Sequence, residues 1–200
     1  FEEEQATSLA AKVAKLADIP KENVTFSGNE AAKYGGALRA DGVSKIEMTK
    51  CKIIENTSNE CGNMFVSGEG TTLTLNDCSV LKNAAKLSGG GFSAMSYARI
   101  IVNGGVINGN SAKEVGGGAW IRKGYMELHG GEISGNTAGI SGGGLQVEGI
   151  DIILHRDVLI MTDGEIIGNS APQGGGVCFL SGKMTVTGGT IEDNSAEYGG

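Results

Sequence analysis

The sequence repeats one unit seven times, and this repetition limits the folds open to the chain more than any other feature. Each unit is anchored by an asparagine, and successive anchors are separated by 27, 27, 27, 26, 33 and 25 residues. The residue three positions before the anchor is always apolar, and the residue two positions after it is always Ala or Ser. The anchors are Asn29, Asn56, Asn83, Asn110, Asn136, Asn169 and Asn194. A fixed period of about 20–50 residues is typical of solenoids and related repeat folds.

Short strands are indicated within each unit by period-two alternation of apolar and polar residues. The first strand has apolar residues ten and eight positions before the anchor, as at Ile100 and Val102. The second follows a glycine-rich turn, and its first apolar residues are Leu38, Phe65, Phe92, Ala119, Leu145 and Val177. The third is the short segment that ends at the anchor. The unit therefore holds three short strands and no helix.

A three-stranded unit cannot bury its apolar face alone, but it can stack on copies of itself with equivalent strands paired in parallel. We therefore predict an all-β fold, a right-handed single-stranded parallel β-helix of about seven coils over residues 21–200, with about 26–27 residues per coil. This fold accounts for the 35 glycines, because most of them lie in turns where a Cβ would crowd the neighbouring coil.

The seven anchoring asparagines are expected to form a ladder inside the solenoid. Each amide would lie above and below an identical side chain, where it can donate to the carbonyl of the next one. Asparagine also tolerates the left-handed backbone conformation of a sharp turn. We therefore favour a structural role for these residues over a catalytic or ligand-binding one.

Residues 1–20 depart from the repeat. Leu9, Val13 and Leu16 would lie on one face of a helix over residues 2–17, with acidic residues in its first turn and Pro20 after its end. A helical cap over the open end of the solenoid is the favoured interpretation, and a connection to a preceding domain is the alternative. No comparable cap follows the last repeat, so we expect a segment of a longer chain.

Charge and hydropathy exclude several classes of partner. The net charge is −7, and the 16 basic residues are not clustered, which argues against a surface for nucleic acid or anionic lipid. No run of about 18 apolar residues is present, so the sequence predicts no membrane span. No Cys-x-x-Cys pair indicates zinc, and we expect neither a metal nor a cofactor.

Two of the four cysteines occupy equivalent positions. Cys51 and Cys78 both lie five residues before an anchor, so they would stack one coil apart, at a separation that suits a disulfide. A stacked pair of thiols remains the alternative. Cys61 and Cys178 fall four repeats apart, too far to pair.

The longest interval holds an insertion of about seven residues near 149–157. It gathers Asp151, His155, Arg156 and Asp157 on one projecting loop, and binding residues concentrate on such loops. A tolerated surface insertion with solvated charges is the simpler interpretation. If the protein contacts a specific ligand, this loop is the first candidate.

A catalytic site is a weaker hypothesis. Enzymes that cleave polysaccharides need paired carboxylates, or acids that bind Ca²⁺ beside a base. Glu127 and His129 share an outward strand face near Asn103 and Thr162, but only one carboxylate enters that patch. The sequence therefore favours a protein without enzymatic activity.

The first repeat resembles a known family. Phe26-Ser27-Gly28-Asn29 and Gly35-Gly36-Ala37-Leu38 are similar to the paired motifs of the chlamydial polymorphic outer membrane proteins. Later repeats replace Phe by Ile or Val and carry three glycines. They look more like the adhesin-like right-handed β-helix repeats of large surface proteins in gut microbes and some protists. The resemblance implies a secreted or surface-displayed stalk or adhesive passenger.

Two functions follow as expectations. The first is an extracellular or cell-surface adhesin-like protein whose partner is a protein or glycan on another cell surface. The second is self-association as a structural subunit of an extracellular filament or appendage. The repeat residues do not discriminate between these functions, because they build the coil and leave the outer surface unspecified.

Overall fold

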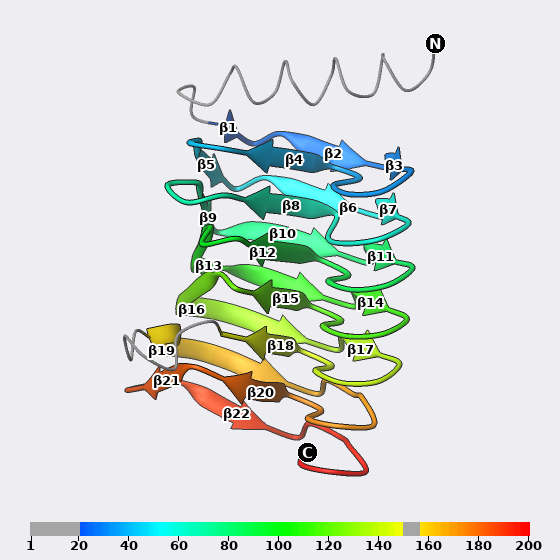
Figure 1. Cartoon of the computed structure of the whole chain (residues 1–200), viewed down its shortest axis with the longest axis vertical. Coiled ribbons are helices and arrows are strands. Elements are labelled where there is room, and N and C mark those ends of the chain that lie inside the picture. Colours follow the sequence, from blue (N-terminus) through cyan, green and yellow to red (C-terminus); the bar gives the residue numbers. More distant parts are fainter. Residues whose placement is uncertain (1–20, 150–156) are drawn as a thin grey trace.

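The computed structural model describes residues 21–149 and 157–200. Within these ranges the chain is a parallel β-solenoid of about six coils with three strands per coil, and none of the described residues is helical. The coils stack along the long axis from β1 to β22 (Figure 1). The prediction of an all-β parallel solenoid is confirmed. The helical cap expected over residues 1–20 lies outside the described residues.

The strands form three parallel sheets that run along the solenoid (Figure 1). The largest sheet contains β1 (Lys21–Glu22), β2 (Thr25–Ser27), β5 (Lys45–Thr49), β6 (Lys52–Ile54), β9 (Thr72–Asn76), β10 (Cys78–Leu81), β13 (Arg99–Asn108), β16 (Tyr125–Ser134), β19 (Asp157–Ile167), β21 (Lys183–Val186) and β22 (Thr190–Glu192). The six-stranded sheet contains β4 (Leu38–Asp41), β8 (Met64–Ser67), β12 (Phe92–Met95), β15 (Ala119–Arg122), β18 (Leu145–Glu148) and β20 (Val177–Ser181). The five-stranded sheet contains the two-residue strands β3 (Glu30–Ala31), β7 (Thr57–Ser58), β11 (Ala84–Ala85), β14 (Ser111–Ala112) and β17 (Thr137–Ala138).

The solenoid has about six coils rather than the expected seven, and the last coil of the described chain is incomplete. The coil that begins with β21 has β22 as its second strand and only isolated bridges at Ser195 and Tyr198 after it. The six intervals between the seven anchoring asparagines agree with this number of coils.

The core is built from columns of identical or similar side chains. The column three residues before each anchor is 0–2 % exposed in the middle of the solenoid, at Ile53, Val80, Ile107, Ile133 and Ile166. Burial of one such aliphatic side chain stabilises the fold by about 1.5–3 kcal/mol. Each side chain packs on its equivalents above and below because the strands pair in register from coil to coil.

The expected alignment of the second strand is wrong in one coil. Met64, not Phe65, pairs with Leu38 and Phe92 and points inward, fully buried. The glycine-rich turn of that coil is one residue shorter than those of its neighbours, which moves every following residue to the opposite face. Phe65 lies outside the coil, where its ring stacks on Tyr34 with the centroids 4.8 Å apart.

The sharp turn before each anchor uses a different residue from the one expected. The residue immediately before each asparagine, and not the asparagine itself, has a left-handed backbone, with φ between 51° and 64° at Gly28, Glu55, Lys82, Gly109, Gly135, Gly168 and Asp193. Glycine adopts this conformation without steric cost, whereas Glu, Lys and Asp do not. Four of the seven positions are glycine, and this turn accounts for them.

Candidate functional site

The anchoring asparagines form a continuous hydrogen-bonded column through the solenoid. The Nδ2 atom of Asn83 donates to Oδ1 of Asn110 at 2.9 Å, and the backbone N–H of Asn83 donates to the same oxygen at 2.9 Å. A second Nδ2 proton of Asn83 reaches the carbonyl oxygen of Ile53 in the preceding coil, at 2.8 Å. The same three bonds recur at Asn56, Asn110, Asn136 and Asn169.

These bonds use the full capacity of each amide. A carboxamide has two donor hydrogens and an oxygen with two lone pairs, and all four are satisfied at Asn83, Asn110 and Asn136. The same three residues are 0 % exposed. They have no group left for a ligand and no path to solvent, so they act within the scaffold.

The insertion does not interrupt this column. Asn136 and Asn169 are 33 residues apart, yet Nδ2 of Asn136 donates to Oδ1 of Asn169 at 2.9 Å, as in the other coils. The insertion lies between β18 and β19 in the sequence, and the strands on either side of it keep the pairing of the other coils. Of the four loop residues predicted as a ligand site, Asp151, His155 and Arg156 lie outside the described residues.

Asp157, the fourth loop residue, is occupied by contacts within the protein. Oδ1 of Asp157 lies 3.0 Å from Nζ of Lys183. The same oxygen accepts a hydrogen bond from the hydroxyl group of Thr185. The Thr185 hydroxyl and the Lys183 ammonium together lower the pKa of Asp157. Asp157 therefore links the start of β19 to β21 in the next coil.

The stacked cysteines lie inside the solenoid as expected from their spacing. Cys51 and Cys78 are 0 % and 2 % exposed. Sγ of Cys78 donates to the carbonyl oxygen of Met48 at 3.3 Å. Burial raises the pKa of Cys78 to about 11, so its thiol is protonated at neutral pH. The alternative of a disulfide between the two stays a prediction.

The patch around Glu127 and His129 forms as a connected polar cluster on the outer face of β16. The carboxylate of Glu127 contacts the guanidinium of Arg99 and lies 3.0 Å from Nε2 of His129. Nδ1 of His129 lies 2.8 Å from Oγ1 of Thr162. Asn103 is not part of this cluster, because its Nδ2 donates to Oδ1 of Asn76. A single carboxylate, already paired with a cation, does not supply the acid and base of a glycosidase.

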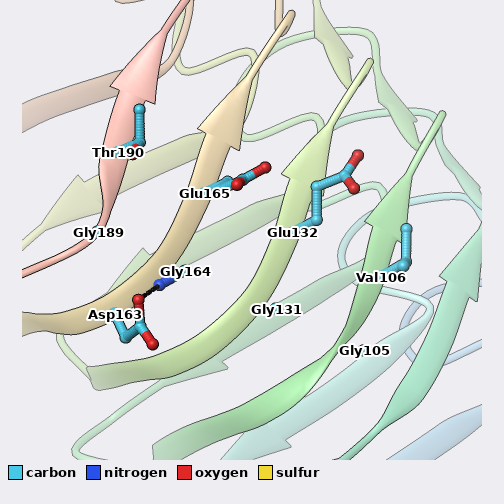
Figure 2. A pocket seen from close by; sticks show the side chains of 9 residues that line it. All are labelled: Gly105, Val106, Gly131, Glu132, Asp163, Gly164, Glu165, Gly189 and Thr190. Atoms are coloured by element: carbon cyan, nitrogen blue, oxygen red, sulfur yellow. Dashed lines mark hydrogen bonds between the residues drawn. The ribbon is translucent and has the colours of Figure 1, made fainter.

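The outer surface of the described chain carries a groove that the sequence did not predict. It has a volume of about 410 Å³ and follows the bend in β13, β16, β19 and the start of β22. Its floor is formed by Gly105, Gly131, Gly164 and Gly189 (Figure 2). All four have positive φ, from 91° to 99°. The chain bends at each of these glycines, and the groove lies along the row of bends.

The glycine floor is a requirement of the coil stacking. A Cβ on Gly131 would lie 2.7 Å from the carbonyl oxygen of Gly105, and a Cβ on Gly164 would lie 2.7 Å from that of Gly131. These distances are shorter than a carbon–oxygen contact allows, so any other residue would separate the coils. The glycine pairs before the anchors were the sequence signal for this groove.

The wall of the groove carries acidic and polar side chains. Glu132 and Glu165 project from neighbouring strands in the same direction (Figure 2), and their Cα atoms are paired in register. Val106 and Thr190 occupy the equivalent positions one coil to either side. Asp163 lies at the rim, where its Oδ1 accepts a hydrogen bond from the N–H of Gly164 at 2.8 Å. None of the three carboxylates forms an ion pair with a described residue.

Within residues 21–149 and 157–200, no group of three or more His, Cys, Asp or Glu side chains is arranged to hold a metal ion. Likewise, these ranges contain no helix of the length and hydropathy that a membrane crossing requires.

Comparison with known proteins gives one match. Residues 23–41 match the model of the Chlamydia polymorphic membrane protein (Pmp) repeat, and this range contains both motifs on which the resemblance was based. No curated protein and no solved structure matches the chain. The chain is therefore similar to Pmp-type repeat proteins in this one repeat, and its described residues form a parallel β-solenoid.

Proposed function

We propose that the chain is a non-catalytic repeat module of an extracellular or cell-surface protein, which acts as an adhesin-like passenger or stalk. The observation that carries the proposal is that the residues that define the repeat point into the solenoid. Asn83, Asn110 and Asn136 are buried and fully hydrogen-bonded, so the repeat specifies a rigid scaffold and leaves the outer surface for recognition. The match to a repeat of chlamydial membrane proteins supports a location at the cell surface.

The partner of such a module is a protein or glycan on another cell surface. A cell-binding assay with the fluorescently labelled protein tests this proposal. Saturable binding that unlabelled protein competes away is the expected result. Binding that rises linearly with concentration and resists competition would contradict an adhesin-like role. Incubation with polysaccharides should release no new reducing ends, and their appearance would contradict the non-catalytic assignment.

The exposed apolar residues of the last coil favour self-association in a filament as a second candidate. Met184, Val186 and Ile191 are 41–45 % exposed, whereas Leu159, Met161 and Ile166 at the equivalent positions one coil earlier are 1–2 % exposed. A further coil can stack on this face of β21 and β22, and a second copy of the chain would supply one. Sedimentation velocity tests this function: concentration-dependent polymers that Ile191→Lys abolishes support it, and a monomer at all concentrations contradicts it.

A further inference from the structure

The groove on β13, β16, β19 and β22 has the dimensions of a ligand site. Its volume of about 410 Å³ falls within the range of about 300–1,000 Å³ that is common for small-molecule sites. It is an open trough, and it crosses four successive coils along the solenoid axis (Figure 2). An occupant would therefore be elongated and would lie along the axis, across the strands.

The walls of the groove present equivalent positions once per coil. Val106, Glu132, Glu165 and Thr190 are related by the strand register, and adjacent coils are about 4.8 Å apart. The floor repeats in the same way, with one glycine in each coil. A surface that offers similar contacts at regular intervals suits a ligand that is itself a linear repeat, such as a polymer chain, better than a compact molecule.

The groove does not have the features that bind a peptide. Within it, β16 is paired with β13 and β19 on its two sides, and β19 is paired with β16, β21 and β22, so these strands have no free edge for an added strand. Val106 is the single apolar side chain that lines it, so no pocket for a hydrophobic anchor is present among the described residues.

The polar groups of the groove are mainly hydrogen-bond acceptors. The carboxylates of Glu132 and Glu165 have no ion-pair partner among the described residues, and they stand side by side in register, an arrangement that opposes folding. Hydroxyl groups that donate to these oxygens would form charge-assisted hydrogen bonds and relieve the repulsion. The same negative charges would repel a polymer that carries carboxylates or sulfates.

We propose that the groove binds a linear glycan without acidic groups, through the hydroxyl groups of successive sugar rings. The inference rests on the proposed function, because it names the class of partner that the outer surface recognises. The glycine floor lets the sugar rings approach the backbone closely, and Glu132, Glu165 and Thr190 accept and donate hydrogen bonds along one edge of the glycan.

Isothermal titration calorimetry with purified oligosaccharides tests the proposal. The probes are hexamers derived from cellulose, xylan, mannan and chitin, the corresponding dimers, and a hexamer of galacturonic acid. We expect saturable binding of at least one neutral hexamer, weaker binding of its dimer, and no binding of the acidic hexamer. Binding of the galacturonate hexamer alone, or of no hexamer, would overturn the proposal.

A pair of charge-reversal variants locates the site. Glu165→Arg places a bulky cation in the groove and should weaken binding of the neutral hexamer by about tenfold or more, since a charge-assisted hydrogen bond is lost. Glu69→Arg makes the same change in an exposed turn that does not line the groove and should leave the affinity unchanged. Equal effects of the two variants, with the circular dichroism of both unchanged, would overturn the assignment.

The cell-binding assay separates this inference from the proposed function. If the protein binds cells saturably after enzymatic removal of their glycans and binds no oligosaccharide, the inference is wrong and the adhesin-like role remains. If it binds no cell surface but still binds a neutral hexamer in the groove, the inference holds and the adhesin-like role is wrong.

Discussion

The middle coils and the last coil of the solenoid use the same residue types at the same positions, yet their environments differ. Ile133 and Ile166 in the middle are 0 % and 1 % exposed, whereas Ile191 in the last coil is 45 % exposed. Asn110 uses its backbone N–H to bond Oδ1 of Asn136, whereas no asparagine lies below Asn194 in the described chain to accept the equivalent bond. Nδ2 of Asn194 donates to the carbonyl oxygen of Ile166 in the preceding coil, as in the other anchors, and to that of Glu192, two residues away.

This difference shows that a coil is completed by its neighbours. The repeat motif specifies local shape and inward direction equally well in every coil, but burial and hydrogen-bond satisfaction need a coil on both sides. Substitutions at equivalent positions in the two regions should therefore differ in cost, and the difference measures the contribution of the neighbouring coil.

Removal of a ladder amide should have the largest effect. Asn110→Ala leaves buried partners without a hydrogen bond, namely the N–H and Nδ2 of Asn83 and the carbonyl oxygen of Val80. Each orphaned group costs about 1–3 kcal/mol, so we expect a loss of about 3–5 kcal/mol in the free energy of unfolding, measured by urea denaturation. Asn194→Ala removes as many side-chain bonds, but at a partly exposed position where water can replace them, so it should lose only about 1 kcal/mol. Equal losses would contradict the comparison.

Truncation of the core column should rank second. Ile133→Ala removes a fully buried side chain and should cost about 2–5 kcal/mol because a cavity remains. The matched change Ile191→Ala should cost about 1 kcal/mol or less, since the side chain is already half exposed. Thermal denaturation of both variants checks the prediction. A larger effect at Ile191 than at Ile133 would show that the last coil is covered in solution.

The left-handed turns should respond equally in the two regions. Lys82 and Asp193 both have φ near 50°, and this conformation is set within the chain rather than by the next coil. Lys82→Gly and Asp193→Gly should each stabilise the protein by about 1 kcal/mol, because the clash of Cβ with the backbone is relieved. The control Lys52→Gly, within strand β6, should destabilise it by a similar amount. A gain restricted to Lys82→Gly would contradict the local origin of the strain.

A pH-dependent contact between the last two coils should have the smallest effect. The contacts with Thr185 and Lys183 lower the pKa of Asp157, so they stabilise the fold above the unfolded pKa of about 3.9 and lose this contribution as the pH falls through the lowered value. Asp157→Asn should therefore lower the thermal midpoint at pH 7, while at a pH below the lowered pKa the variant and the parent protein should unfold at the same temperature. A deficit that persists in acid would contradict the role of the charge.

The architecture could be predicted from the sequence because the solenoid repeats its constraints. An asparagine every 25–33 residues, with an apolar residue three positions earlier, fixes the period and the inward face of each coil. The misplacement of Phe65 arose from one missing residue in a turn, which a fixed offset from the anchor cannot detect. The left-handed residue before the anchor was missed because Glu55, Lys82 and Asp193 carry no glycine signal.

The candidate site was much less predictable. The patch of Glu127 and His129 followed from alternation along one strand, and the structure brings these residues together with Thr162. The groove depends on how four strands bend at Gly105, Gly131, Gly164 and Gly189, which the sequence shows as a column of glycines without showing which side becomes concave.

Native-state hydrogen exchange, followed by NMR, tests the central claim most directly. If the asparagines are bonded from coil to coil inside a solenoid, the backbone N–H groups of Asn83 and Asn110, each 2.9 Å from the Oδ1 of the next asparagine, should exchange among the slowest in the protein. The N–H of Asn194 should exchange at least about a hundredfold faster, at a rate close to that of an open chain end. Exchange of the Asn110 N–H as fast as that of Asn194 would contradict the ladder and the stacking of coils that it represents.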